Sequence, residues 1–181
     1  MTRHQDLKMY HEDRRITDQE IIKAILSANN VARIALHDEP YPYIVAMNYG
    51  YEWEKELVLY FHMAVRGHRI DLIRKNPNVA VNISAFLDRV GHKNYRKEPH
   101  DYRSVNVFGR AEIISPIENP DEFLHGLSVL CRNNFRPGVA KITEDMKARL
   151  FVLKITAEQI TAKSQYPIST VEEAEMPENS L

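Results

Sequence analysis

One segment of the sequence combines the residue types and the spacing of an anion-binding site. Residues 60–79, YFHMAVRGHRIDLIRKNPNV, have the pattern of a strand end, a short loop, a glycine and a helix start. The first turn of a helix presents N–H groups without partners and the positive end of the helix dipole, which attract anions. His68 and Arg69 in this turn, with Arg66 just before it, add basic side chains. The segment is a candidate phosphate site, and the alternative is a solvated basic helix end.

A histidine ends the apolar run that precedes this segment. His62 follows the residues LVLYF at 57–61. At the mouth of a pocket it could donate a hydrogen bond to a ligand or take part in proton transfer. The alternative is a histidine satisfied within the core or at its rim. Its spacing from His68 does not match common zinc sites, so we predict no metal site.

Two other chemically capable features have simpler structural interpretations. Residues 88–103 contain seven basic and three acidic side chains. A solvated loop is the first interpretation of this segment, and a lid that attracts an anionic ligand is the alternative. Cys131 lies on the apolar face of a predicted helix, which favours packing over nucleophilic catalysis.

The elements that must position these residues follow from the apolar periodicity. Six strands are predicted, at 31–37, 43–51, 57–62, 79–87, 102–115 and 150–163. Helices are predicted at about 17–29, 68–76 and 120–134, the first with Thr17 as N-cap of a capping box that includes Glu20. Gly109 inside the fifth predicted strand indicates a bend or bulge of the kind that barrel closure requires. The pattern predicts an α+β, mainly β, antiparallel barrel with helices packed outside.

Composition and charge restrict the class of protein. The chain has 181 residues, 44% of them hydrophobic and 27% charged, which is typical of a single globular domain. The net charge of −1 argues against a dedicated nucleic-acid binder. The single cysteine, the absence of a signal-like N-terminus and the lack of a long apolar run favour a cytoplasmic protein without membrane spans. We expect an N-terminal arm at 1–15, the barrel domain at 16–163 and an acidic C-terminal tail at 164–181.

Three motifs in the same order and at similar separations resemble the FMN-binding split-barrel family. They are PYIVAMNYGY (42–51), LYFHMAVRGHRIDLIRKNPNV (59–79) and DYRSVNVFGRAEII (101–114). The chain is most similar to the nitroimidazole-resistance (Nim) branch, whose members are relatives of pyridoxamine 5′-phosphate oxidase. The resemblance covers roughly residues 15–163. It implies a six-stranded split barrel, a homodimer, and FMN bound at the subunit interface.

The resemblance also implies which residues bind the cofactor. The segment from 43 to 48 would run along the isoalloxazine edge and contact it largely through backbone groups. Phe61 and His62 would lie beside the ring and the ribityl chain, with His62 as the catalytic residue that contacts the substrate or donates a proton. The implied cofactor-binding residues are Tyr43, Val45, Ala46, Met47, Asn48, Phe61, His62, Gly67, His68, Arg69, Ser104 and Lys163.

Several of these positions carry more specific expectations. His68 and Arg69 fall where the family binds the FMN phosphate, in agreement with the anion site inferred above from the residues alone. Ser104 falls where the oxidase relatives place a glutamine near the flavin, and Lys163 lies near the end of the last strand. The branch often has proline where this chain has Ala46, and lysine where it has His68. A histidine can still donate to a phosphate, but its charge depends on pH.

The resemblance implies an FMN-dependent oxidoreductase that reduces a small planar acceptor, such as a nitroaromatic, with electrons from NAD(P)H or another reductant. FAD is an alternative cofactor, because the phosphate site is common to both flavins. A flavin or haem carrier or sensor without turnover is the alternative function. Vitamin B6 oxidation is not expected, because the arginine-rich second strand and the C-terminal tryptophan motif of the oxidases are absent. The residues Ile-Thr-Ala-Lys at 160–163 stand in place of that motif.

Overall fold

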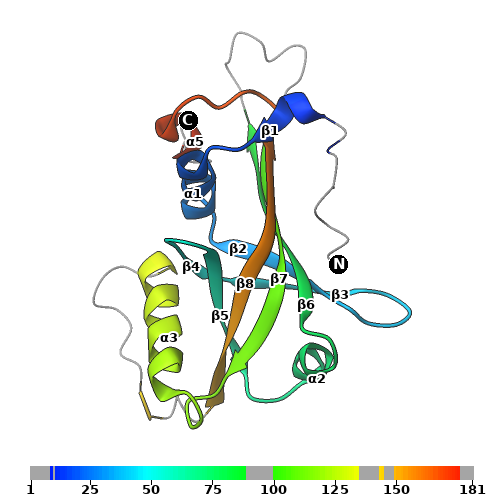
Figure 1. The fold of residues 1–181 in the computed structure, drawn as a ribbon, viewed down its shortest axis with the longest axis vertical. Coiled ribbons are helices and arrows are strands. Elements are labelled where there is room, and N and C mark those ends of the chain that lie inside the picture. The colour runs from blue at the N-terminus through cyan, green and yellow to red at the C-terminus, as the bar shows by residue number, and fades with distance from the viewer. Residues whose placement is uncertain (1–8, 10, 89–99, 135–142, 145–148, 176–181) are drawn as a thin grey trace. The chain divides into compact units, whose positions relative to one another are not determined.

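The computed structural model describes residues 9, 11–88, 100–134, 143–144 and 149–175. Eight strands of this part of the chain form one sheet in the order β3-β2-β6-β7-β8-β5-β4, with β1 pairing to β8. The sheet is a mainly antiparallel half-barrel with flanking helices, which confirms the predicted α+β, mainly β class (Figure 1). In chain order the elements are η1 (Glu12–Arg14), β1 (Arg15–Ile16), α1 (Gln19–Ser27), β2 (Val31–Leu36), β3 (Tyr43–Asn48), β4 (Gly50–Trp53), β5 (Leu57–Ala64), α2 (His68–Lys75), β6 (Asn78–Asp88), β7 (His100–Ile114), α3 (Pro120–Asn134), β8 (Leu150–Ser164) and α5 (Val171–Glu175).

The predicted strand 43–51 is two strands in the structure. β3 pairs with β2, from Leu36 opposite Tyr43 to Val31 opposite Asn48, whereas β4 pairs with β5. Tyr49 lies between them, and its carbonyl oxygen accepts a hydrogen bond of 2.6 Å from Nδ2 of Asn134. Because the break reflects a change of pairing partner from β2 to β5, the pattern of residues 43–51 alone does not reveal it.

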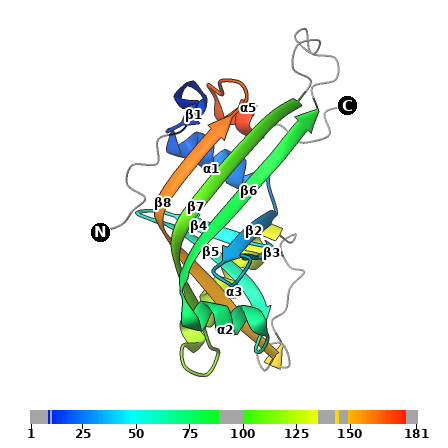
Figure 2. The same ribbon diagram turned by 90° about the vertical axis from the view of Figure 1, so that its right-hand side faces the viewer.

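The described residues fall into two compact units, and strands β6, β7 and β8 contribute to both. The first unit consists of the described residues within 1–29, 82–107 and 159–181, and the second of those within 30–81 and 108–158. Figure 2 shows these three long strands side by side. The predicted loop at 88–101 lies mostly outside the described residues.

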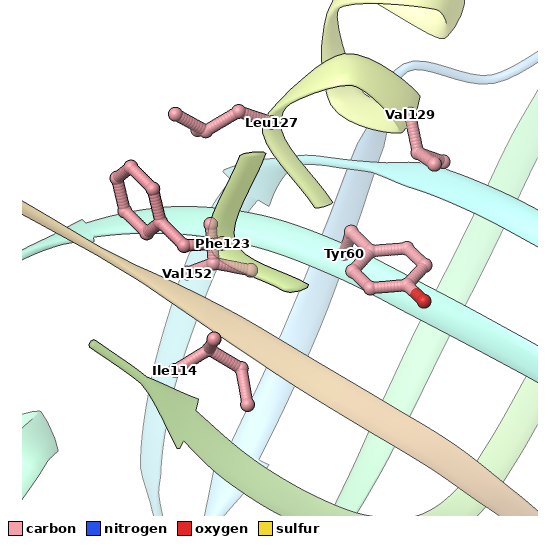
Figure 3. Close-up of a cluster of buried hydrophobic side chains, with 6 residues drawn as sticks. All are labelled: Tyr60, Ile114, Phe123, Leu127, Val129 and Val152. Atoms are coloured by element: carbon pink, nitrogen blue, oxygen red, sulfur yellow. The ribbon is translucent and has the colours of Figure 1, made fainter. Parts of the chain in front are cut away.

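The core of the second unit lies on both faces of β5. Side chains alternate between the faces of a strand, and both Phe61 on one face and Tyr60 on the other are buried. The helix α3 packs on β4 and β5, and its residues Phe123 and Leu127 join Tyr60 in an apolar cluster (Figure 3). Cys131, which was predicted to lie on the apolar face of this helix, is half-buried, whereas Phe123, Leu127 and Leu130 are buried. Burial raises the pKa of the Cys131 thiol, which disfavours the reactive thiolate.

The first unit is organised around α1 and the C-terminal helix α5, which lie against each other (Figure 1). Ile22 and Ile25 are buried on α1, as is Ala174 on α5. The buried guanidinium of Arg103 on β7 donates through Nη1 to the carbonyl oxygen of Ala174 at 2.6 Å. The described part of the acidic tail is thus held by apolar packing and by a charge-assisted hydrogen bond.

The first helix begins one residue later than predicted. Asp18, not Thr17, is the N-cap of α1, because its carboxylate accepts the backbone N–H groups of Glu20 and Ile21 at 2.8 and 3.2 Å. Aspartate and threonine both serve as N-caps, so the capping-box interpretation was wrong by one position. The strand β5 also extends beyond its predicted end at His62, because Met63 and Ala64 pair with Phe151 and Leu150 of β8.

The corrected cap leads to a stability prediction. Replacement of Asp18 by alanine leaves two N–H groups of α1 without their side-chain acceptor, and we expect the free energy of unfolding to fall by about 1 kcal/mol. Replacement of the exposed Thr17 by alanine is the matched control, and it should lower the free energy of unfolding by much less than about 1 kcal/mol. Urea unfolding of both variants measures the difference. A larger loss for Thr17→Ala would show that the cap is Thr17.

No helix in the described part of the chain is long and apolar enough to cross a membrane.

Candidate functional site

The N-terminus of α2 has the backbone geometry of an anion-binding site. Gly67 is the N-cap, with φ of 132°, a conformation that favours glycine, and an added Cβ would meet no atom within 4 Å. The N–H of Ile70 donates to the carbonyl oxygen of Gly67 at 2.9 Å. No side chain caps the helix, and none of the hydrogen bonds found in the described residues uses the N–H of His68 or Arg69. These two donors are therefore available to a ligand.

The helix is held firmly from its apolar side. Ile70, Leu72 and Ile73 are buried, and Pro77 follows two residues after the end of α2. The predicted helix at 68–76 is thereby confirmed to within one residue. A rigid helix directs its first N–H groups to one fixed point, which is what recognition of a small anion requires.

His68 has a carboxylate partner that the sequence did not predict. Its Nε2 lies 2.7 Å from Oδ2 of Asp38, in the β2–β3 connection, and its ring meets that of Tyr43 edge-on at 5.5 Å between centroids. The hydrogen bond to His68, followed by that from the backbone N–H of Glu39, lowers the pKa of Asp38. Asp38 therefore remains a carboxylate at neutral pH.

Arg69 reaches from α2 toward β3. Its Nη1 lies 3.1 Å from the sulfur of Met47, and the residue is half-buried. A thioether is a weak acceptor, so the guanidinium retains most of its hydrogen-bonding capacity. The structure thus brings Tyr43 and Met47 of β3 into contact with His68 and Arg69 of α2.

The residues of β3 alternate in exposure along the strand. Tyr43, Val45 and Met47 are half-buried, whereas Ala46 and Asn48 are exposed. Asn48 donates through Nδ2 to the carbonyl oxygen of Asn30 at 2.9 Å. β3 ends the sheet order, so within the described residues one side of its backbone faces no further strand. N–H and C=O groups on this side can bind a planar heteroaromatic edge.

The two predicted residues of β5 lie in different environments. Phe61 is fully buried and packs near Tyr49, with ring centroids 6.3 Å apart. Its side chain belongs to the core, which leaves only its backbone for a ligand. His62 lies on the opposite face of β5 and is exposed. Partial burial, and in addition the charge of Arg69, lowers the pKa of His62, so its imidazole is neutral at neutral pH.

Ser104 and Lys163 belong to the first unit. Ser104 is buried on β7, and its hydroxyl has no hydrogen-bond partner in the described part of the chain. Lys163 on β8 pairs with Arg15 of β1, and its Nζ lies 5.4 Å from the ring centroid of Tyr102. Their predicted roles at a cofactor stay predictions.

A hollow of about 310 Å³ lies elsewhere on the second unit. None of the predicted cofactor residues lines it. Its lining combines apolar side chains with one basic and one acidic group, and consists of Ile73, Arg74, Ala111, Ile113, Ser115, Glu118 and Phe151. We assign no function to this hollow.

The fold of the chain is similar to those of several solved structures. The chain is 24% identical to a candidate 5-nitroimidazole antibiotic resistance protein from Bacteroides thetaiotaomicron, with a TM-score of 0.68 over 83% of this chain and 86% of that one. It is similar to the flavocytochrome Anf3 from Azotobacter vinelandii, with 18% identity and a TM-score of 0.67 over 94% and 78% of the two chains. An FAD-binding protein from Mesorhizobium loti shares 23% identity and a TM-score of 0.58 over 84% and 98%.

The family model for pyridoxamine 5′-phosphate oxidase matches residues 18–164. This match spans both units, including the whole of β3, β5 and α2. The chain therefore belongs to the pyridoxamine 5′-phosphate oxidase family.

Proposed function

We propose that this chain binds FMN, with the phosphate at the N-terminus of α2, and acts as a flavin-dependent oxidoreductase. The observation that carries the proposal is the pair of N–H groups of His68 and Arg69 that no hydrogen bond of the described residues uses, in a first turn that also carries the arginine side chain of Arg69. Open space around Gly67 leaves room for a phosphate to approach the backbone. The family of the chain supports a flavin, and its similarity to an FAD-binding protein keeps FAD as the alternative form.

The residues of the second unit fit the parts of such a ligand. Two backbone N–H groups and one guanidinium match the acceptor oxygens of a phosphate monoester. The side of β3 that no strand of the described residues pairs with, along Val45 and Ala46, offers backbone groups to a planar ring edge. When bound, a flavin supplies hydride and electron transfer. The chain's own contribution would be to hold the ring edge through the backbone groups of β3 and the phosphate through the first turn of α2.

His62 is the residue we propose for contact with the substrate. It is the first exposed residue of β5, whose preceding five residues are buried or half-buried, and Arg69 is close enough to influence its pKa. A planar electron acceptor such as a nitroaromatic needs protons as well as electrons, and an imidazole can deliver them. The similarity to a candidate 5-nitroimidazole resistance protein supports this class of acceptor.

The lowered pKa of His62 predicts the pH dependence of turnover. The protonated imidazole is the proton donor, and its fraction grows as pH falls through a value below the ordinary one of about 6.5. We expect the turnover number of the wild type to rise as the pH falls below about 6.5, and His62→Ala to lose this rise while retaining bound flavin. His125→Ala, which removes an exposed histidine from α3, is the matched control. Identical pH profiles for wild type and His62→Ala would remove His62 from this role.

We further propose that the functional form is a homodimer. Two large apolar side chains are exposed at the strand β3, which ends the sheet. Tyr41, just before β3, is 79% exposed, and Ile44, on β3, is 65% exposed. Burial of such side chains against a second copy would be favourable, and a second subunit would shield the part of a flavin that one small barrel leaves uncovered. Light scattering of the flavin-loaded protein should give twice the mass of the chain. A monomer that binds FMN tightly would contradict the dimer.

The absorbance spectrum and mass of the copurified ligand test the cofactor. Flavin bands and the mass of FMN support the proposal, whereas a haem Soret band would favour the alternative carrier function, to which the flavocytochrome similarity points. Turnover is tested separately by anaerobic reduction with NADH or NADPH, followed by reoxidation with a nitroaromatic. Failure of both half-reactions in a flavin-loaded protein would favour a carrier or sensor.

A further inference from the structure

We propose that phosphate capture at the N-terminus of α2 is coupled to protonation of His68, and that Asp38 imposes this coupling. This inference rests on the proposed function and concerns the regulation of the same site. It assigns a positioning role to Asp38, a residue outside the predicted cofactor set.

Two contacts fix the ring of His68. Its Nε2 lies 2.7 Å from Oδ2 of Asp38, whose Oδ1 accepts the backbone N–H of Glu39 at 2.9 Å. The ring of Tyr43 stands at 84° to the imidazole, with centroids 5.5 Å apart. The carboxylate is itself oriented by the backbone, so the imidazole is held with Nε2 toward Asp38. Nδ1 has no hydrogen-bond partner in the described residues, and the proposal assigns it to the incoming anion.

The contact with Asp38 decides what Nδ1 can do. A carboxylate only accepts hydrogen bonds, so the proton of a neutral imidazole must sit on Nε2, and Nδ1 then carries a lone pair. The lone pair of Nδ1 repels a phosphate oxygen, because both groups are hydrogen-bond acceptors. When the imidazole is protonated, both ring nitrogens donate. Nε2 can then retain its hydrogen bond to Asp38 while Nδ1 donates to the phosphate. Binding of a phosphate therefore favours uptake of a proton by His68.

The charge of Asp38 works in the same direction. Its pKa is lowered, so a phosphate at the helix terminus has a carboxylate for a neighbour. The side chain of Asp38 is 27% exposed and that of His68 is 57% exposed, so solvent screens this repulsion without removing it. A protonated His68 offsets the charge of Asp38. Other titratable groups lie on the elements around His68. They are His37, Glu39 and Tyr41 of the β2–β3 connection, Tyr43 of β3, Arg66 before α2, and Arg69, Asp71, Arg74 and Lys75 on α2.

Lysine at position 68 is the matched substitution. A lysine remains charged far above neutral pH, so His68→Lys retains a cation but cannot couple binding to a proton near neutral pH. Asp38→Asn retains an amide oxygen that can accept from Nε2 and removes the negative charge. The two variants separate the proton on His68 from the charge on Asp38.

The test measures dissociation constants for FMN and riboflavin by flavin fluorescence in phosphate-free buffer. The ratio of the two constants gives the contribution of the phosphate group to the affinity. The phosphate itself also loses a proton at about pH 6, and this effect is the same in the His68→Lys protein, which therefore serves as the reference. From about pH 8 to about pH 6, the preference of the wild type for FMN should rise relative to that of His68→Lys, by at most about tenfold per pH unit. At pH 8, Asp38→Asn should bind FMN about twofold to fivefold more tightly than the wild type and riboflavin equally.

Calorimetry of the wild type alone gives a second reading that no substitution affects. Titrations at one pH in buffers of different ionisation enthalpy should show proton uptake with FMN that exceeds any uptake with riboflavin. Equal proton uptake for both flavins, or equal pH slopes for wild type and His68→Lys, would overturn the coupling while the proposed function stands. If neither flavin binds, the proposed function fails and the coupling falls with it.

Discussion

Replacement of Arg69 by glutamine should weaken FMN binding by roughly tenfold to 100-fold and leave riboflavin binding unchanged. Arg69 is a half-buried residue of the first turn of α2, and the only acceptor found for its Nη1 in the described residues is the sulfur of Met47. A charge-assisted hydrogen bond to a phosphate is worth about 1.5–3 kcal/mol, which corresponds to that loss of affinity. Loss of the Met47 contact costs little, because a thioether is a weak acceptor.

The control for Arg69→Gln is Arg74→Gln. Arg74 is an exposed arginine in the last turn of the same helix, so the two variants change the net charge of the chain equally. Dissociation constants from flavin fluorescence compare the variants. Arg74→Gln should bind both flavins as the wild type does. An Arg69→Gln protein that loses affinity for FMN and riboflavin to the same degree would show that Arg69 maintains the fold and does not bind the phosphate.

Replacement of Gly109 by alanine should produce a large loss of stability. An added Cβ on this residue of β7 would lie 2.1 Å from the carbonyl oxygen of Thr156 and 2.9 Å from its carbonyl carbon. Both atoms belong to the backbone of β8, so no side-chain rotation relieves the overlap. We expect the free energy of unfolding to fall by about 3 kcal/mol or more, at the upper end for an overpacked core.

Gly67→Ala is the control for this prediction. An added Cβ at Gly67 meets no atom within 4 Å, although its φ of 132° is unfavourable for alanine. Its cost should be about 1–2 kcal/mol, from backbone strain alone. Urea unfolding measures both variants. Equal stability of Gly109→Ala and wild type would mean that β7 and β8 do not approach each other as closely as the structure shows.

The sequence predicted those parts of the fold that local patterns determine. The helices predicted at 68–76 and 120–134 are α2 and α3 of the structure, with bounds that agree to within one residue. Gly109 was predicted to mark a bend, and the structure shows why glycine is needed there, since the backbone of β8 lies against it.

The differences arise where a distant residue decides the local structure. β3 and β4 are separate strands because β3 pairs with β2 and β4 pairs with β5, and the side chain of Asn134 donates to the carbonyl oxygen of Tyr49 between them. The N-cap differed by one residue because Thr17 and Asp18 are both suitable types, and only the backbone geometry selects Asp18.

The same distinction applies to the candidate site. Gly67, His68 and Arg69 could be identified because an anion-binding helix start is a contiguous segment. Asp38 could not, because it approaches His68 from 30 residues away, once β2 and β3 have formed their antiparallel pair. An acidic residue in a turn before a proline has no local feature that indicates a histidine partner. For Phe61, the burial of alternate residues on β5 directs the side chain into the core, whatever the role of its neighbour His62.

A crystal structure of the protein with FMN is the most direct test of the site. We expect phosphate oxygens at hydrogen-bond distance, about 2.7–3.2 Å, from the backbone nitrogens of His68 and Arg69 and from the guanidinium of Arg69. A flavin whose phosphate lies away from the start of α2, with those nitrogens bonded to protein or water, would contradict the proposed site.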